Sequence, residues 1–282
     1  MTKLGRFKMI YVYIVASAVL MLCGEWAFDI FRQSWSFYGV PLIFIGLLLA
    51  FILLHLIFVV AILLLTKPKT IKKPCESFYR AILKYTLPMV FSLAGVRINI
   101  SGTEKVPKDK RFLLVCNHQH DFDPAIIYYA LPDSEIAFIG KKDIISEMPL
   151  IANAMLKLKC MFLDRENNRE AAKTIVNAVK VIKADENSVA LFPEGYTNQT
   201  NGELLPFRNG AFKVAYKAQV PIVVCAVNNT KSIVKNLLKR KTVVEFRVLD
   251  VIEPSAFLEL HTNELGDNIY SIMNSAVNEM KK

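Results

Sequence analysis

At 282 residues, the chain is long enough for one sizeable domain with a smaller region beside it. Hydrophobic residues make up 53% of it and the mean hydropathy is +0.33, which is high for a soluble protein and indicates membrane-spanning segments. The net charge of +10 suits nucleic acid, an anionic membrane or anionic substrates without choosing among them. The five cysteines form no C-x-x-C pair, which excludes the usual zinc spacing, and three in later apolar runs are expected to be buried, reduced thiols: Cys116, Cys160 and Cys225.

Two uncharged apolar stretches predict a membrane anchor within residues 1–70. Phe37–Leu65 contains no Asp, Glu, Lys or Arg over 29 residues, whereas a bilayer core needs about 20. Met9–Gly24 is shorter, at 16 residues, and is either a second span or the apolar part of a secretory signal. We expect it to be an uncleaved span, so that the chain begins with a transmembrane helical hairpin.

Basic residues flank these stretches unevenly. The loop between them has Arg32 as its only cation, while cations cluster before the first stretch and after the second: Lys3, Arg6, Lys8, Lys67, Lys69, Lys72 and Lys73. By the positive-inside rule, both ends of the hairpin face the cytoplasm. We therefore expect an integral protein of the cell membrane whose later domain lies on the cytoplasmic face.

Residues 71–96 follow as a basic connector. Within them, Phe78–Leu93 mixes large apolar residues with Arg80 and Lys84 and is interrupted by Pro88. Such a segment is either an amphipathic helix lying in the membrane interface or an ordinary helix docked on the following domain.

Residues 97–282 show short apolar runs that alternate with longer helical stretches. The expected strands are Phe112–Cys116, Ile136–Ile139, Met161–Leu163, Ser188–Phe192, Ile222–Val227 and Val243–Leu249. The expected helices are Arg169–Ile182, Asn209–Lys217 and Leu265–Met280. This alternation predicts a three-layer α/β domain with a largely parallel sheet.

Polar clusters follow three of the expected strands directly. Asn117–Asp123 follows the first strand, Asp164 and Arg165 follow Met161–Leu163, and Pro193–Gly195 follows Ser188–Phe192. Ligands of open α/β sheets bind beyond the carboxyl ends of the strands. If these strands are parallel neighbours, the clusters form one site.

The first cluster offers acid–base chemistry. A histidine accepts a proton near neutral pH when a carboxylate fixes its tautomer, which suits His118 and Asp123, although a turn must bring the two together. Asp123 precedes Pro124 and also resembles a helix N-cap, and His118 is alternatively a structural turn histidine. His120 and Asp121 are alternatively part of a metal site.

The other clusters offer charge. Arg165 is a fixed cation suited to phosphate, or else a surface residue paired with Glu166 or Glu170. Glu194 and Gly195 are expected to form a tight turn under a substrate, in which the Glu194 carboxylate accepts a hydrogen bond from a hydroxyl or orients Arg165. The alternative is a plain turn from strand to loop without a role in binding. The chain has no G-x-S-x-G elbow, P-loop or G-x-G-x-x-G motif, and these clusters contain no obvious covalent nucleophile.

Four ordered motifs resemble the glycerolipid acyltransferase family, in particular the bacterial 1-acyl-sn-glycerol-3-phosphate (lysophosphatidic acid) acyltransferases. The motifs are Asn117-His118 with Asp123, Phe162–Arg165, Phe192–Gly195 and Val220–Ile222, and the likeness spans about residues 97–250. The resemblance implies that His118 is the base and Asp123 its partner. It also implies substrate-binding positions at Asn117, Arg165, Glu194 and Gly195.

One motif departs from the family. The usual Glu-Gly-Thr-Arg-Ser is replaced by Glu194-Gly195-Tyr196-Thr197-Asn198, so that the usual arginine is absent. We expect Arg208, or alternatively Lys213, to supply the missing charge at the acceptor's phosphate. The Val220–Ile222 motif is associated with the acyl chain, and equally well marks the start of a strand.

The resemblance implies transfer of a fatty acyl group from acyl-CoA or acyl-acyl carrier protein to the sn-2 hydroxyl of lysophosphatidic acid. The product is phosphatidic acid, in phospholipid biosynthesis. No metal or bound cofactor is expected, and the expected partners are a lysophospholipid acceptor, an acyl thioester donor such as acyl carrier protein, and the membrane, but not nucleic acid. The alternatives are another lysophospholipid acceptor, a metal-dependent membrane phosphohydrolase, or a non-catalytic scaffold.

Overall fold

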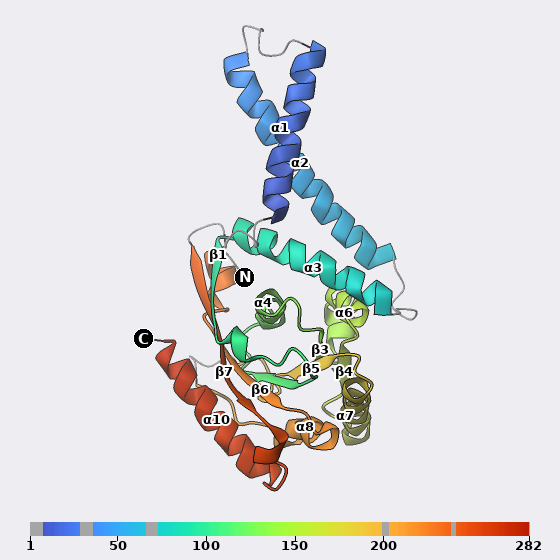
Figure 1. Cartoon of the computed structure of the whole chain (residues 1–282), viewed down its shortest axis with the longest axis vertical. Helices are drawn as coiled ribbons and strands as arrows, with labels where there is room; N and C mark the ends of the chain where they lie inside the picture. Colours follow the sequence, from blue (N-terminus) through green and yellow to red (C-terminus); the bar gives the residue numbers. More distant parts are fainter. Residues whose placement is uncertain (1–7, 29–35, 66–72, 199–202, 238–240, 282) are drawn as a thin grey trace. The chain divides into compact units, whose positions relative to one another are not determined.

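The computed structural model describes residues 8–28, 36–65, 73–198, 203–237 and 241–281, and the chain divides into two compact units, Met1–Thr70 and Ile71–Lys282. The first unit is a pair of helices, α1 (Lys8–Phe28) and α2 (Ser36–Leu65), which cross one another (Figure 1). Where they pack, the ring of Tyr13 stacks on that of Phe51 with 5.9 Å between centroids. Both helices are long and apolar enough to cross a membrane, over Met9–Trp26 and Tyr38–Leu65.

The structure does not test the expected orientation of this hairpin. Most of the charges on which it depends lie outside the described residues: Lys3, Arg6, Arg32, Lys67, Lys69 and Lys72.

The second unit is built on a seven-stranded sheet with the order β1-β7-β6-β2-β5-β3-β4. The strands are β1 (Val96–Ser101), β2 (Leu113–Cys116), β3 (Ile136–Lys141), β4 (Met161–Leu163), β5 (Ser188–Leu191), β6 (Ile222–Asn228) and β7 (Thr242–Ile252). Every neighbouring pair is parallel except β6 with β7. The expectation of a largely parallel sheet is confirmed.

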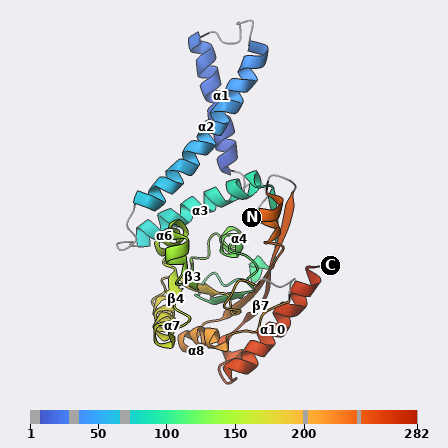
Figure 2. The same cartoon turned by 180° about the vertical axis from the view of Figure 1, so that it is seen from behind.

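Helices cover both faces of this sheet. They are α3 (Lys73–Leu93), α4 (Asp123–Ala130), α5 (Ile144–Glu147), α6 (Pro149–Lys157), α7 (Asn168–Lys183), α8 (Lys213–Ala218), α9 (Ser232–Asn236) and α10 (Thr262–Glu279). Figures 1 and 2 show α3 and α4 on one side of the strands and α8 and α10 on the other. The three-layer arrangement predicted from the alternation of strands and helices is therefore correct.

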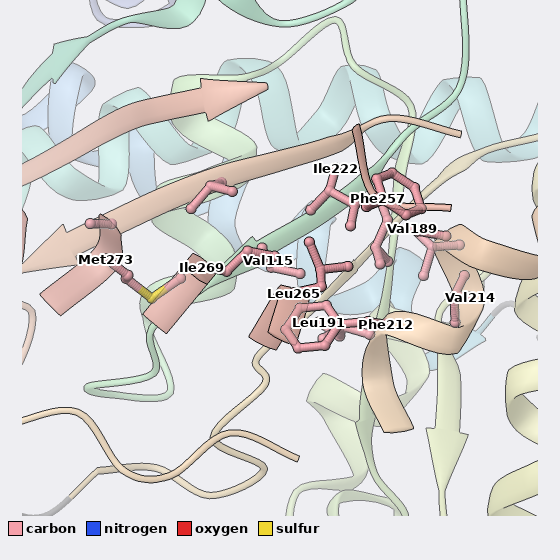
Figure 3. Close-up of a cluster of buried hydrophobic side chains, with 14 of the residues drawn as sticks. Val115, Val189, Leu191, Phe212, Val214, Ile222, Phe257, Leu265, Ile269 and Met273 are labelled. Carbon is pink, nitrogen blue, oxygen red and sulfur yellow. The ribbon is translucent and has the colours of Figure 1, made fainter. Parts of the chain in front are cut away.

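The core on the α8 and α10 side explains why the central strands are apolar throughout. Val115 of β2, Leu191 of β5 and Ile222 of β6 point at the helices across this layer (Figure 3). From α10, Leu265, Ile269, Met273 and Val277 lie four residues apart, so they share one helix face. Because helices cover both faces, β2 and β5 are buried at every position and show no polar alternation.

Helix α3 packs on the rest of the second unit, in agreement with one of the two interpretations of Phe78–Leu93. It runs through Pro88 without interruption. Glu76 is buried and accepts hydrogen bonds from Arg80 (2.6 Å) and from Asn187 (2.6 Å), while Arg80 also donates to the carbonyl of Ile136 (2.9 Å). Other large side chains remain exposed: Phe78, Tyr85 and Leu93.

Two elements differ from the sequence-based expectation. β1 was not among the predicted strands, which are continuous apolar runs, although Val96–Ser101 alternates apolar and polar residues, the pattern of a strand with one buried face. Among the described strands it lies at the edge of the sheet and neighbours β7. The helix expected over Asn209–Lys217 begins as a 3-10 turn, Asn209–Phe212, and becomes α-helical at α8.

Candidate active site

The three polar clusters lie beyond the carboxyl ends of β2, β5 and β4. These strands are parallel, β5 is the neighbour of β2, and β3 alone separates β5 from β4. Their ends therefore meet at one edge of the sheet, as the sequence predicted. Contacts between the clusters show which residues are brought together.

His118 and Asp123 form a hydrogen-bonded pair in the turn between β2 and α4. His118 Nδ1 lies 2.9 Å from Asp123 Oδ2, and the carboxylate is fully buried while the imidazole is 14% exposed. The same oxygen accepts the backbone N–H groups of Gln119 (2.6 Å) and His120 (2.8 Å). A carboxylate oxygen only accepts hydrogen bonds, so we assign the ring proton to Nδ1, which leaves Nε2 as the acceptor.

The N-cap interpretation of Asp123 is wrong, because the N-cap of α4 is Phe122 and Asp123 is the first helical residue. Its carboxylate reaches back to the preceding turn, which closes the five-residue separation that a helix face could not span. The other oxygen, Oδ1, is buried and has no hydrogen-bond partner among the described residues. The turn is therefore built around one carboxylate oxygen.

The imidazole of His118 is also fixed from outside the turn. It stacks on the ring of Phe192 with 4.1 Å between centroids and 11° between planes. The backbone carbonyl of His118 accepts the N–H of Asn198 (2.7 Å), and the ring Nε2 lies 3.2 Å from the hydroxyl of Thr197. Thr197 was not predicted as a site residue, although it occupies the position at which the family's third motif usually has an arginine.

Glu194 ties the histidine turn to the loop after β5. Oε1 accepts the backbone N–H of His118 (2.8 Å), and Oε2 accepts the N–H of Leu205 (2.8 Å) and the side-chain amide of Asn198 (3.0 Å). Burial raises the pKa of Glu194, and these three donors oppose the rise. The contacts of Glu194 are thus with the turn and the loop, and none is with Arg165.

Two predicted positions contact the sheet itself. Asn117 is buried, and its amide donates to the carbonyl of Val227 (2.9 Å) and accepts the N–H of Val227 (2.8 Å), which joins the ends of β2 and β6. Both polar atoms of the Asn117 amide are thus hydrogen-bonded to Val227. Binding of substrate by Asn117 stays a prediction. Likewise, Pro221 accepts the N–H of Leu113 (2.9 Å) just before Ile222 begins β6, which supports the strand-start interpretation of that motif.

A second group of side chains gathers around Tyr196. The guanidinium of half-buried Arg165 lies over its ring at 4.8 Å from the centroid, and that of exposed Arg208 at 4.9 Å. Arg208 also donates to the Tyr196 hydroxyl (3.0 Å). Of the two cations proposed to replace the absent motif arginine, Arg208 is the one that reaches this group, while Lys213 is exposed on α8.

Gly195 has a specific reason to be glycine. Its φ is +75°, and a Cβ there would lie 2.8 Å from Cδ and Nε of Arg208. The side chain of Arg208 therefore passes directly over the glycine. Gly195 is part of the support for Arg208.

The expected alternative pairings of Arg165 are not seen. Glu170 pairs with Lys173 (2.6 Å), and Asp164 pairs with Lys142 (3.0 Å). Within the described part of the chain, neither Arg165 nor Arg208 forms an ion pair. Burial lowers the pKa of Arg165, and the charge of Arg208 lowers it further.

The ring of His120 contacts Phe122. The two rings stack with 5.2 Å between centroids, and His120 Nδ1 accepts the N–H of Phe122 (3.4 Å). In the described ranges, no group of three or more His, Cys, Asp or Glu side chains is arranged to hold a metal ion. Three buried thiols are free, as expected: Cys116, Cys160 and Cys225.

The chain is similar in sequence to known acyltransferases. Residues 97–228 match the family model described as Acyltransferase. The chain is 29% identical over 197 residues to a 1-acyl-sn-glycerol-3-phosphate acyltransferase of Haemophilus influenzae, covering 68% of this chain and 78% of that protein. It is 31% identical over 147 residues to the human 1-acyl-sn-glycerol-3-phosphate acyltransferase alpha, covering 50% of this chain and 49% of that protein.

The fold also matches a solved structure. The crystal structure of the 1-acyl-sn-glycerophosphate acyltransferase from Thermotoga maritima superposes with a TM-score of 0.56 at 19% identity, covering 98% of this chain and 96% of that one. The resemblance carried by the four motifs is confirmed by the family match over residues 97–228. Residues 97–228 therefore form an acyltransferase domain, with the predicted dyad at the carboxyl edge of its sheet.

Proposed function

We propose that this acyltransferase moves a fatty acyl group from an acyl thioester to the sn-2 hydroxyl of lysophosphatidic acid, giving phosphatidic acid for phospholipid biosynthesis. The observation that carries the proposal is the His118–Asp123 pair, in which Nε2 remains the ring's acceptor. The names of the relatives support this choice of acceptor. Acyl-CoA or acyl-acyl carrier protein is the donor.

The reaction needs one base that later acts as an acid. Nε2 of His118 takes the proton of the acceptor hydroxyl as its oxygen attacks the thioester carbonyl, and Asp123 stabilises the imidazolium that forms. The carbon–sulfur bond then breaks, and the thiolate of the carrier takes the proton from Nε2. The hydroxyl of Thr197, 3.2 Å from Nε2, lies near the position that the acceptor hydroxyl takes in this scheme.

The phosphate of the acceptor is assigned to Arg165 and Arg208. Two guanidinium groups without carboxylate partners in the described structure are suited to a dianion, because each forms charge-assisted hydrogen bonds with phosphate oxygens. Asn117, Glu194 and Gly195 act behind this surface by fixing the strand ends, the dyad turn and Arg208. The scheme uses no metal and no bound cofactor.

The proposed location is the cell membrane, with α1 and α2 as an integral hairpin and the catalytic unit on the cytoplasmic face. The apolar spans Met9–Trp26 and Tyr38–Leu65 support the anchor. Both substrates carry fatty acyl chains, so an anchored enzyme meets them where they reside. The net charge of +10 suits an anionic membrane surface, where each nearby cation contributes about 1 kcal/mol.

Product analysis tests the activity. The purified full chain is incubated with a labelled acyl thioester and, separately, lysophosphatidate, other lysophospholipids and monoacylglycerol, and the products are identified by mass. We expect phosphatidate to be the main product. A strong preference for another acceptor would disprove the lysophosphatidate assignment, and release of inorganic phosphate that a chelator abolishes would favour the phosphohydrolase.

Cysteine labelling in intact cells tests the topology. Cys116, Cys160 and Cys225 are buried, so only Cys23 and Cys75 need replacement before a single cysteine is placed at Ile30 or at Lys173, which is exposed. An impermeant thiol reagent should label Ile30→Cys and should label Lys173→Cys only after permeabilisation. The reverse pattern would overturn the orientation.

A further inference from the structure

The motif that lacks its usual arginine contains an exposed tyrosine in contact with both unpaired cations. Tyr196 is 52% exposed, yet its ring and hydroxyl make three contacts with Arg165 and Arg208. These arginines come from different parts of the chain, one after β4 and one after the loop that follows β5. Tyr196 is thus the residue that brings the two cations to one place.

The contacts fix the two cations by different means. A guanidinium over an aromatic face is attracted by the ring's quadrupole. Arg208 is held in addition by its hydrogen bond to the hydroxyl and by its passage over Gly195. Arg165 has the ring contact and its own partial burial.

Holding two cations together without an anion is unfavourable. The charge of Arg208 lowers the pKa of Arg165, as expected for like charges at close range. The charge of Asp143 opposes this effect only in part, because the pKa of Arg165 remains lowered, and Asp164 and Glu170 are each paired with a lysine. The arrangement therefore favours an anionic ligand that contacts both guanidinium groups at the same time.

The position of this group relative to the dyad also suits one class of ligand. Thr197, the next residue along the chain, has its hydroxyl 3.2 Å from His118 Nε2. The residue that contacts both cations is therefore the chain neighbour of the residue that contacts the proton acceptor, so both groups belong to one site. This arrangement suits a phosphate monoester that also carries a free hydroxyl.

We propose that Tyr196 is a positioning residue that assembles Arg165 and Arg208 into a two-armed site for a phosphate monoester, in place of the arginine that the family has at residue 197. The tyrosine supplies no charge of its own. It holds Arg208, which is 12 residues further along the chain, beside Arg165. The inference rests on the proposed function only in that the acceptor carries a phosphate.

Two substitutions separate the ring from the hydroxyl. Tyr196→Phe removes only the hydrogen bond to Arg208 and should raise the KM for lysophosphatidate about 3- to 10-fold. Tyr196→Leu also removes both ring contacts and should raise it about 10- to 100-fold. The kcat at saturating lysophosphatidate and the KM for monoacylglycerol should stay within about threefold of wild type, since neither depends on the phosphate site. Tyr85→Leu, which truncates a similarly exposed tyrosine on α3, is the matched control.

A competitor makes the test independent of the true acceptor. Glycerol 3-phosphate should inhibit the full-length wild type and Tyr196→Phe, and should inhibit Tyr196→Leu only weakly. If wild type prefers an acceptor other than lysophosphatidate but this inhibition still depends on Tyr196, the proposed function fails and the site stands. Unchanged inhibition in Tyr196→Leu, equal losses on both acceptors, or no inhibition of wild type would overturn the role of Tyr196.

Discussion

The turn around Asp123 and the cluster around Tyr196 lie beside one another in the site but are built in opposite ways. In the turn, one buried carboxylate oxygen receives a ring N–H and two backbone N–H groups, and the histidine is further fixed by Phe192 and Glu194. Around Tyr196, two cations lie over a half-exposed ring without an ion-pair partner among the described residues. The hydrogen bonds of the turn are formed without substrate, whereas the positive charges of the cluster are left without ion-pair partners in the described residues.

The difference reflects what each region must do. Proton transfer requires a base whose tautomer and direction are set before substrate arrives, so the protein fixes the ring through Nδ1, and Nε2, beside the Thr197 hydroxyl, is left to take the proton in the proposed reaction. Recognition of an anion requires that the protein leave its cations unneutralised, because an internal carboxylate would compete with the ligand. Substitutions in the turn should therefore affect every acceptor, and those in the cluster should affect only anionic ones.

The largest expected effect is on the dyad. His118→Ala should lower kcat about 10²- to 10⁴-fold on every acceptor, because the base is lost, and Asp123→Asn should be nearly as damaging. Rates with lysophosphatidate and monoacylglycerol, together with circular dichroism and membrane fractionation, measure this. His120→Ala is the control, since its ring faces Phe122. Retention of more than a tenth of the activity by His118→Ala, with loss in His120→Ala, would identify the other histidine as the base.

A smaller and selective effect is expected at the arginines. Arg165→Ala should weaken transition-state binding of lysophosphatidate by about 2–5 kcal/mol, as when one partner of a buried charge pair is truncated, and should barely affect monoacylglycerol. Arg208→Ala should show the same selectivity more weakly, because Arg208 is more exposed. The ratio of kcat/KM on the two acceptors is the measurement. Equal losses on both would assign these arginines to the donor or to the fold.

The smallest expected effect is at Glu194, which joins the two regions. Glu194→Gln keeps one acceptor oxygen and places an amide against donors on the other side, so we expect a loss of about 1–3 kcal/mol in the free energy of unfolding. Because His118 loses part of its support, kcat should fall on both acceptors alike. Chemical unfolding and kinetics of the full chain test this, and a loss confined to lysophosphatidate would place Glu194 in the anion site instead.

The pH dependence of that loss has a definite sign. Burial raises the pKa of Glu194 above its ordinary value of 4.5, so the folded protein favours the protonated carboxyl. Its contribution to the free energy of unfolding is therefore full below pH 4.5 and declines as the pH rises through the folded-state pKa. The stability difference between wild type and Glu194→Gln should be larger at pH 4 than at pH 7. A difference that grows with pH would show that the ionised form is the better bound.

The sequence predicted most of what depends on local pattern. The central strands are continuous apolar runs, and polar residues directly after β2, β4 and β5 mark the site because the end of a parallel strand is a fixed place in this fold. β1 was missed because the predicted strands were continuous apolar runs, whereas Val96–Ser101 alternates apolar and polar residues, a pattern that itself indicates a strand with one buried face. The dyad was expected from the polar residues after β2 and from the family resemblance, but the N-cap interpretation of Asp123 was wrong because the backbone turn, which no pattern encodes, decides where the carboxylate points.

Roles that depend on contacts across the chain were not predictable. Glu194 and Asn117 were expected to face substrate, yet their described partners are His118 and Val227, which are 76 and 110 residues away in sequence. Likewise, the third motif showed that its usual arginine is absent, but the contact of Tyr196 with Arg208, the proposed replacement, is seen only in the structure. Long-range hydrogen bonds leave little local signature.

The order of strands sets an order of events during synthesis. β1 pairs only with β7, whose first partner residue is Thr242, and β2, which leads into the dyad turn, is flanked by the later strands β5 and β6. Nearly the whole catalytic unit must therefore leave the ribosome before His118 acquires its supports. By then α1 and α2 have long emerged. If they insert as proposed, the enzyme reaches the bilayer while it is still inactive, and acyl transfer begins only after anchoring.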